Sequence, residues 1–243
     1  MIKKLSKKAS LLSALVLTMA LFAGCSNEKE NQKVADIEVK TIATKELQDK
    51  LSDDSWVVVD TRINDAFNGW KLDEVERGGH IKGAVDFSAN WLTVDSKDKE
   101  KTLDKALETK GIEKDKNIVL YDANGKDAKE VANYLSEKGY KNLYTYNVAD
   151  WAKDESLPME SYENYEMIVP ATTVNDILDG KKPETFENSK NIQIVEASWG
   201  EESEAYSKGH VPTSVHINTD TVEPPPQWML ASDEELAKFA NDY

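Results

Sequence analysis

Short apolar runs alternate with segments of helical periodicity from residue 40 to the end of the sequence. The apolar and aromatic runs predict strands at residues 56–59, 84–87, 117–121 and 143–146. Apolar residues at helical spacing predict helices at residues 45–51, 103–107 and 128–138, and Gly139 stands where a glycine commonly ends a helix. Because strand and helix alternate, the pattern predicts an α/β fold in which helices flank a central parallel sheet.

The order of these elements begins again in the second half of the sequence, which predicts two copies of one unit. The second copy repeats the first helix, the first strand and the helix at 103–107, at residues 173–178, 193–196 and 233–239. Residues 209–215 repeat the pattern of residues 79–85, and both segments begin with a Gly-His pair. The strands align at an offset of 136 residues and the Gly-His pairs at 130, so the first copy has six extra residues around positions 68–76.

The first 24 residues have the composition of a secretory signal. Four lysines lie among the first eight residues, and the apolar stretch 11–23 is too short to span a membrane comfortably. Leu21-Phe22-Ala23-Gly24-Cys25 resembles the lipobox of bacterial lipoproteins, with Phe22 in place of the usual Leu. The resemblance implies cleavage before Cys25, acylation of Cys25 and a lipid-anchored protein of the cell membrane that faces outside the cytoplasm. An ordinary secretory signal beside an unrelated cysteine is the alternative.

Charge and composition exclude several classes of partner. The chain has 45 acidic and 30 basic residues and a net charge of -15, and removal of residues 1–24 takes away four lysines and no acid, which leaves -19. Such a chain repels phosphate, so we expect no nucleic-acid partner. Residues 25–39, rich in Glu, Lys, Asn and Gln, are interpreted as a solvated tether. Because one cysteine and three histidines are too few for a disulfide or for the common zinc sites, we expect no metal and no cofactor.

The motifs of the first copy follow one another in a characteristic order. A strand ends in Asp60-Thr61-Arg62, and a Gly-His-Ile-Lys-Gly-Ala turn follows at residues 79–84. The strand 117–121, the Gly139-Tyr140 turn and Trp151 come after it. This order resembles the rhodanese domain, and residues 40–243 together resemble tandem rhodaneses. The resemblance implies a thiosulfate or 3-mercaptopyruvate sulfurtransferase, in which the second domain carries the nucleophile and the first is a non-catalytic copy.

Sulfur transfer of this kind requires a thiolate that takes up the sulfur as a persulfide. A loop that leads from a parallel strand into a helix directs several backbone N–H groups at one point and stabilises an anion there. In the first copy this loop is Asp122-Ala123-Asn124-Gly125-Lys126-Asp127, and the resemblance places Asp122 at the position of the family's cysteine. A carboxylate cannot accept sulfur. We therefore expect no catalytic residue in this loop, and we expect Asp122 to accept N–H bonds and cap the helix.

A retained binding site is the alternative for this loop, with Lys126 or Asn124 in contact with a small ligand. Asp122 and Asp127 argue against the anionic sulfur donors of the family, because like charges repel. For the whole protein, a ligand- or partner-binding module without sulfurtransferase chemistry is the alternative function. A solute-binding lipoprotein would fit the anchor but not the order of the rhodanese motifs.

The second copy contains only the first part of the repeated unit. In the first copy 42 residues separate His80 from Asp122, and the same interval from His210 passes the last residue of the sequence. The expected domains are a lipoprotein signal peptide at 1–24, a tether at 25–39, a non-catalytic rhodanese-like domain at 40–155, a linker at 156–171 and the N-terminal part of a second domain at 172–243. We expect either a fragment of a longer lipoprotein or a premature stop. In a complete protein, a small anionic sulfur compound is the expected ligand.

Three further features have a structural and a functional interpretation. Asp60 with Arg62 is expected to form a structural ion pair rather than to contact substrate. His80 and His210 occupy equivalent positions, which favours a turn-stabilising hydrogen bond in each copy over a metal or acid–base role. The proline-rich run 223–228 is expected to be a rigid loop that holds its tryptophan against the core, and a ligand for a proline-reading partner is the alternative.

Overall fold

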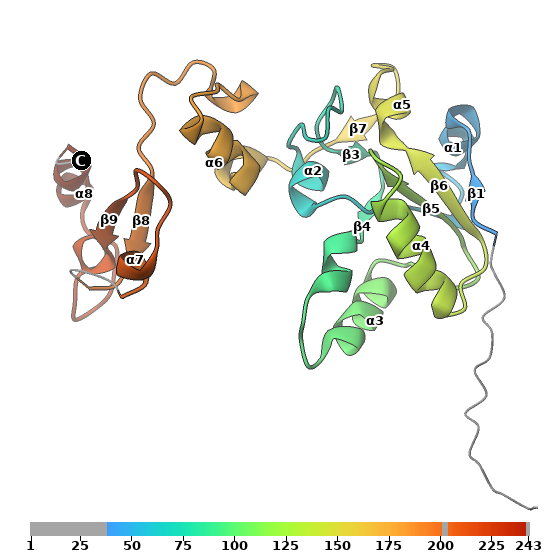
Figure 1. The fold of residues 1–243 in the computed structure, drawn as a ribbon, viewed down its shortest axis with the longest axis horizontal. Helices are drawn as coiled ribbons and strands as arrows, with labels where there is room; N and C mark the ends of the chain where they lie inside the picture. The colour runs from blue at the N-terminus through green and yellow to red at the C-terminus, as the bar shows by residue number, and fades with distance from the viewer. Residues whose placement is uncertain (1–37, 201–203, 242–243) are drawn as a thin grey trace, which may run out of the picture. The chain divides into compact units, whose positions relative to one another are not determined.

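A five-stranded sheet forms the centre of the first part of the chain (Figure 1). The structure is a computed structural model that describes residues 38–200 and 204–241, so the predicted signal peptide, Cys25 and nearly all of the predicted tether lie outside the described residues. In spatial order the strands are β1 (Lys40–Thr41), β6 (Leu143–Asn147), β5 (Asn117–Asp122), β2 (Trp56–Asp60) and β4 (Val85–Asp86). Every neighbouring pair is parallel, which confirms the predicted parallel sheet.

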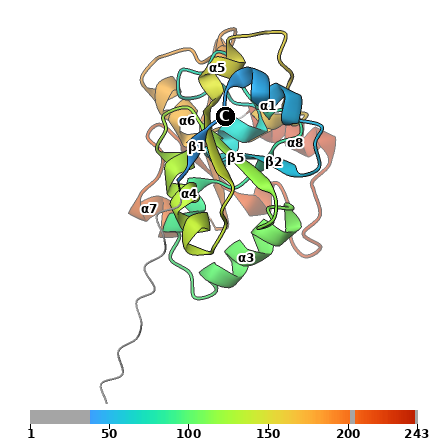
Figure 2. The same ribbon diagram turned by 90° about the vertical axis from the view of Figure 1, so that its right-hand side faces the viewer.

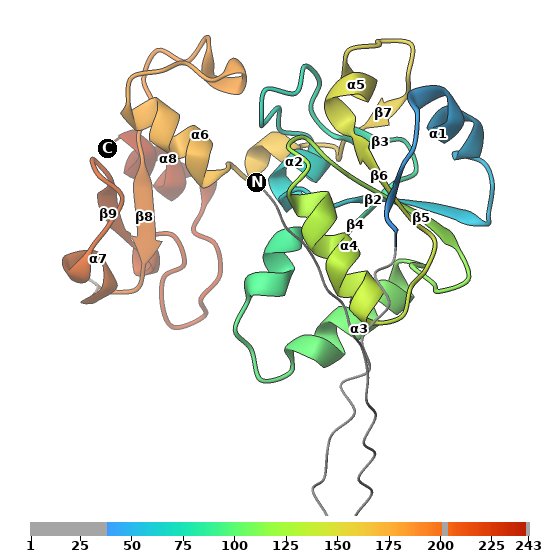
Figure 3. The same ribbon diagram turned by 45° about the vertical axis from the view of Figure 1, so that its right-hand side comes forward.

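Two groups of helices cover the two faces of this sheet (Figures 1 and 2). The helices of this part are α1 (Thr44–Lys50), α2 (Asn64–Asn68), η1 (Ala89–Thr93), α3 (Lys99–Thr109), α4 (Asp127–Glu137), α5 (Val148–Ala152) and η2 (Tyr165–Met167). Helices α3 and α4 pack with Ile118 and Leu120 of β5 on one face, and Figure 3 shows α4 lying along the strands. Helices α1 and α5 pack with Val119 and Tyr121 on the other. Because both faces are covered, β5 is an unbroken apolar run.

A second, two-stranded sheet joins the predicted linker to the first domain. Strand β3 (His80–Ile81) pairs antiparallel with β7 (Met159–Glu160), which lies inside residues 156–171. Arg77 strengthens this junction, because its guanidinium donates to four backbone carbonyl oxygens at and after the end of α5, at 2.8 to 2.9 Å. Cations near the last carbonyls of a helix are favourable. Part of the predicted linker is thus packed on the domain.

The C-terminal part of the chain contains a pair of parallel strands, β8 (Val195–Ser198) and β9 (Val215–Asn218). Its helices are α6 (Ala171–Leu178), η3 (Glu184–Phe186), α7 (Glu204–Lys208), η4 (Thr219–Thr221) and α8 (Asp233–Asn241). Glu196 pairs with His216 in this sheet, as Asp60 pairs with Asp86 in the first one. These are equivalent pairs at the two offsets of the sequence repeat. The register therefore agrees with the alignment of the two copies.

The expected elements of the first copy occur within a few residues of their predicted places. The predicted helix 128–138 is α4, and the predicted strand 143–146 is β6. In the second copy, the strand expected at 193–196 is β8 and begins two residues later. Pattern analysis did not find β1, β3 and β7, because a two-residue strand has no periodicity to detect. Among the described residues, no helix has the length and apolar character needed to cross a membrane.

Candidate functional site

The loop between β5 and α4 is built around the side chain of Asp122, which is 1% exposed. Its Oδ1 accepts a hydrogen bond from the backbone N–H of Gly125 at 2.8 Å, and its Oδ2 accepts one from the N–H of Ala128 at 2.9 Å. Ala128 lies in the first turn of α4, where backbone N–H groups have no partner within the helix. Both oxygens of the carboxylate therefore accept backbone N–H groups of the loop and of the first turn of α4, and we call this set of donors the cradle. Asp122 caps the helix from inside the loop.

The turn itself requires two further residues. Gly125 has a φ of +75°, a backbone conformation that side chains with a Cβ rarely adopt. Asn124 accepts a hydrogen bond from the N–H of Lys126 through its Oδ1 at 2.8 Å, which closes a turn of the Asx type. Lys126 stands at the N-cap position of α4 and makes no side-chain capping bond. The cap of α4 at its buried side therefore depends on Asp122.

A cavity of about 640 Å³ opens beside this loop, between α4 and the strands β1 and β6. Asp122, Ala123, Asn124 and Gly125 line it, whereas Lys126 and Asp127 do not. The structure thus brings four of the six predicted loop residues to one cavity. The other lining residues come from β1 and the residue before it, from α4 and from β6, and were not found in the sequence: Val39, Thr41, Ala128, Lys129, Ala132, Asn133, Thr145, Tyr146 and Asn147.

Asn147 shows which signal could have found some of these residues. It follows directly on the apolar run of β6, and the carboxyl ends of parallel strands meet at one edge of a sheet. Its Oδ1 accepts from the N–H of Ala149 at 2.9 Å and caps α5. Asn133 and Lys129, in contrast, reach the cavity from α4, and only the packing of α4 on the sheet places them there.

The electrostatic environment of the loop is acidic. Burial raises the pKa of the Asp127 carboxyl, and the nearby carboxylates of Asp122, Glu130 and Asp73 raise it further, against the smaller opposing effect of Lys126. Asp73 lies in the extra segment of the first copy, around residues 68–76, and acts on the Asp127 carboxyl from there. A cradle of this kind would favour an anion through its N–H groups, but the carboxylates around it oppose a second negative charge.

The buried pair of Asp60 and Arg62 is structural, as expected. The guanidinium donates to both carboxylate oxygens, at 3.0 and 2.6 Å, and to the backbone oxygen of Gly79 at 2.7 Å. Asp60 and Arg62 are 0% and 1% exposed, so neither is accessible to a substrate. Burial and the neighbouring carboxylate raise the pKa of the Tyr121 hydroxyl beside this pair, where Tyr121 accepts from the N–H of Ile81 at 3.1 Å.

The two equivalent histidines make the same contacts. His80 Nδ1 lies 2.7 Å from the backbone oxygen of Phe67, and the two rings stack at 3.9 Å. His210 Nδ1 lies 2.9 Å from the oxygen of Tyr206, and their rings also stack at 3.9 Å. The expected hydrogen bond is present in both copies, and it joins the histidine to the preceding helix. In the described part of the chain, no group of three potential metal ligands gathers.

The interpretation of the proline-rich run was wrong. Trp228 is 53% exposed, and the adjacent Met229 and Leu230 are 71% and 66% exposed. The loop therefore does not hold its tryptophan against the core. Its backbone adopts a φ of +52° at Trp228, and the following apolar residues face solvent with it. Sequence alone could not reveal this, because exposure depends on which other elements pack on the loop.

The strand order, the loop after β5 and the position of α4 define a class of protein. Residues 43–151 match the Rhodanese-like domain. This match agrees with the sequence motifs, and the α/β fold with a central parallel sheet flanked by helices matches the rhodanese-like fold.

The particular proteins that the chain resembles include a thiosulfate sulfurtransferase and an ergothioneine biosynthesis enzyme. It is 26% identical over 230 residues to thiosulfate sulfurtransferase YnjE of Escherichia coli strain K12, covering 95% of this chain and 48% of that protein. The wild-type structure of EanB matches with a TM-score of 0.72 and 30% identity, covering 82% of this chain and 45% of that chain. The anaerobic ergothioneine biosynthesis enzyme of Chlorobium limicola, solved with trimethyl histidine, matches with a TM-score of 0.71 and 30% identity, at the same coverage. The chain spans about half the length of these relatives. These matches do not favour the binding-module alternative.

Proposed function

We propose that the first domain is a non-catalytic rhodanese-like domain in a membrane-anchored protein of the sulfurtransferase type. The observation that carries the proposal is the position of Asp122. Its two oxygens accept the N–H groups of Gly125 and Ala128, the donors that a sulfur-carrying thiolate would need. A persulfide forms on a thiolate sulfur, so a carboxylate cannot carry the transferred sulfur. Asp122 instead supplies the cradle with a permanent internal anion.

If this proposal is correct, the first domain itself does not transfer sulfur. The only cysteine of the sequence is Cys25, which lies far from the loop in sequence and is the proposed site of lipid attachment. The chain spans about half the length of its relatives, and we infer that any transfer from thiosulfate or mercaptopyruvate in the whole protein is carried by residues outside the first domain. Solved relatives bind hercynine and ergothioneine, which supports a small molecule as the ligand of such a protein.

The test of the first part is a sulfur-transfer assay on the chain as it stands. With thiosulfate as donor and cyanide as acceptor, the chain is expected to form no more thiocyanate than buffer. The Asp122→Cys variant, made with Cys25→Ser, is expected to gain the mass of one sulfur atom on the new thiol after exposure to thiosulfate, because the cradle lowers the pKa of a thiol. Addition of Asp127→Asn should increase this labelling, because it removes a neighbouring carboxylate that repels the donor.

The matched control is Asp122→Ser, which is close in size and carries no thiol. Thiocyanate formation by the unmodified chain would contradict the non-catalytic assignment. If neither Asp122→Cys nor its combination with Asp127→Asn takes up sulfur while both remain folded, the loop does not stabilise a sulfur anion and the proposed relation to the family's cradle is wrong.

The anchor is tested separately by cell fractionation. Cys25 lies at the end of a lipobox-like sequence, and two or three acyl chains are enough for stable attachment where one is not. The Cys25→Ser variant is expected to appear in the soluble fraction, and the matched Ser26→Ala variant in the membrane pellet. A Cys25→Ser protein that stays in the pellet after a high-salt wash would rule out the lipid anchor.

A further inference from the structure

The cavity beside the loop after β5 has a floor of short side chains. Its volume of about 640 Å³ lies within the range of ordinary small-molecule sites. Ala128 and Ala132 line it from α4 and are 1% and 0% exposed. Across the cavity, Thr41 of β1 and Thr145 of β6 are paired neighbours in the sheet. Because all of these side chains are short, α4 and the edge of the sheet leave room for the uncharged body of a ligand.

Around this floor, two asparagines present unused hydrogen-bond donors. Asn124 and Asn147 line the cavity and are exposed. Their orientations are fixed, because the Oδ1 atom of each accepts the backbone N–H of the residue two positions further along. In the described part of the chain, their NH₂ groups have no hydrogen-bond partner. An NH₂ group only donates, so these two side chains can bind an acceptor oxygen.

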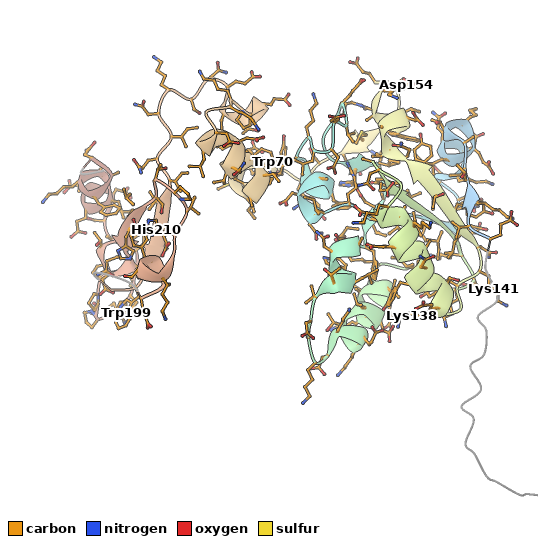
Figure 4. All side chains as sticks on the ribbon, viewed as in Figure 1. Trp70, Lys138, Lys141, Asp154, Trp199 and His210 are labelled. Atoms are coloured by element: carbon orange, nitrogen blue, oxygen red, sulfur yellow. The ribbon has the colours of Figure 1, made fainter. Side chains whose placement is uncertain are left out.

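Lys129 gives the cavity its positive charge. It lies four residues before Asn133, so both side chains are on one face of α4, and both line the cavity. Neither side chain has an ion pair or a hydrogen bond among the described residues. Lys126 does not line the cavity, and Lys138 and Lys141 lie beyond the other end of α4 (Figure 4). Among the described residues that line the cavity, Lys129 is therefore the one cation.

The carboxylates of the loop limit the ligand to one negative charge. Asp122 lines the cavity, but it is 1% exposed and both of its oxygens already accept backbone N–H groups. Its charge and that of Lys129 balance, so one carboxylate can be attracted to the exposed lysine. A dianion would bring a second charge near Asp122 and Asp127 without a second cation to neutralise it.

We propose that this cavity binds a small monocarboxylate that carries one further, uncharged acceptor oxygen. The carboxylate lies between Nζ of Lys129 and the side-chain amide of Asn133. The uncharged oxygen accepts from the NH₂ groups of Asn124 and Asn147, and the short chain between the two ends contacts the floor. This site goes beyond the non-catalytic assignment, because it uses Asp122 only as a cap and requires no sulfur transfer. Binding can therefore be present or absent whatever the outcome of the thiocyanate assay.

N-acetylglycine is the probe, because it has one carboxylate and one amide oxygen. It is titrated into the full chain carrying Cys25→Ser, and the side-chain NH₂ signals of Asn124 and Asn147 are followed in ¹H–¹⁵N NMR spectra. Both signals should shift and saturate. N-acetylglycinamide lacks the charge and should bind about tenfold more weakly or worse, because hydrogen bonds to charged groups are the stronger ones. Pentanoate keeps the charge and the chain length but lacks the second oxygen, and should bind about fivefold more weakly.

Two lysine variants test the position of the charge. Lys129→Met should raise the dissociation constant of N-acetylglycine about tenfold or more. Lys126→Met is the matched control, because it makes the same change three residues away and outside the cavity, and it should leave the constant within about twofold of the parent. Asn133→Asp should weaken binding at least as much as Lys129→Met, since it places a like charge beside the carboxylate.

Both lysines are exposed, so neither change should disturb folding, and unchanged backbone signals verify this. The absence of saturable shifts with N-acetylglycine would overturn the proposal. Equally tight binding of either analogue, or equal effects of the two lysine variants, would also overturn it.

Discussion

The replacement of Asp122 by alanine is the most direct test of the cradle. Asp122→Ala removes the acceptor of two backbone donors, the N–H groups of Gly125 and Ala128. A hydrogen bond to a charged group contributes about 1.5–3 kcal/mol, and loss of an N-cap alone costs about 0.5–2 kcal/mol. Gly125 is exposed, so water can partly replace the lost acceptor there, whereas Ala128 is buried. We therefore expect a loss of about 2–4 kcal/mol in the free energy of unfolding.

Urea unfolding measures this loss. With a slope of about 2 kcal/mol per molar, the midpoint should fall by roughly 1–2 M. Asp122→Asn should cost about half as much, because its amide oxygen can accept from one N–H while its NH₂ group faces the other donor. Asn124→Ala is the matched control, since it also removes an acceptor of one N–H in this loop but lies exposed. A loss below about 0.5 kcal/mol for Asp122→Ala would refute the view that this carboxylate holds the loop together.

Two further predictions concern the charged residues Arg77 and Asp127. Arg77→Met should lower the free energy of unfolding by about 2–3 kcal/mol, because four carbonyl oxygens around the end of α5 lose a charged donor. Arg77→Lys should recover only part of this loss. Urea unfolding of the parent chain and the two variants measures both effects. The pKa of Asp127 is raised in the folded state, chiefly by burial and by Asp122, so its ionisation opposes folding and this cost disappears as the pH falls through the raised pKa. The stability of Asp127→Asn relative to the parent chain should therefore increase between about pH 3 and pH 6, by less than about 1 kcal/mol after solvent screening, and a difference that stays flat or falls with pH would contradict the shift.

Local patterns were sufficient for the main strands and for the loop after β5. The run 117–121 is apolar at every position but the first, and such a run is recognisable because both faces of a parallel strand are covered. The interpretation of Asp122 as a cap was possible for a similar reason. Its two donors lie three and six residues further along the chain, so the geometry depends on one strand end and one helix start.

Features that depend on distant residues were not predictable. The contacts of Arg77 join residues 74 to 80 positions apart, and β3 pairs with β7 across a similar distance. Neither leaves a periodic signal in its own segment. The cavity beside the loop likewise combines residues of β1, α4 and β6, of which only those at strand ends follow a rule that can be applied to sequence.

The sequence by itself predicted the alternation of strands and helices and the carboxylate in the loop after β5, because each is encoded in residues close together along the chain. Only the tertiary structure decided which side chains are covered. Val59 and Val195 occupy equivalent places in the repeat, yet the first is buried and the second exposed. Burial depends on the neighbours that a strand receives in space, and among the described residues β2 has strands on both edges while β8 has one.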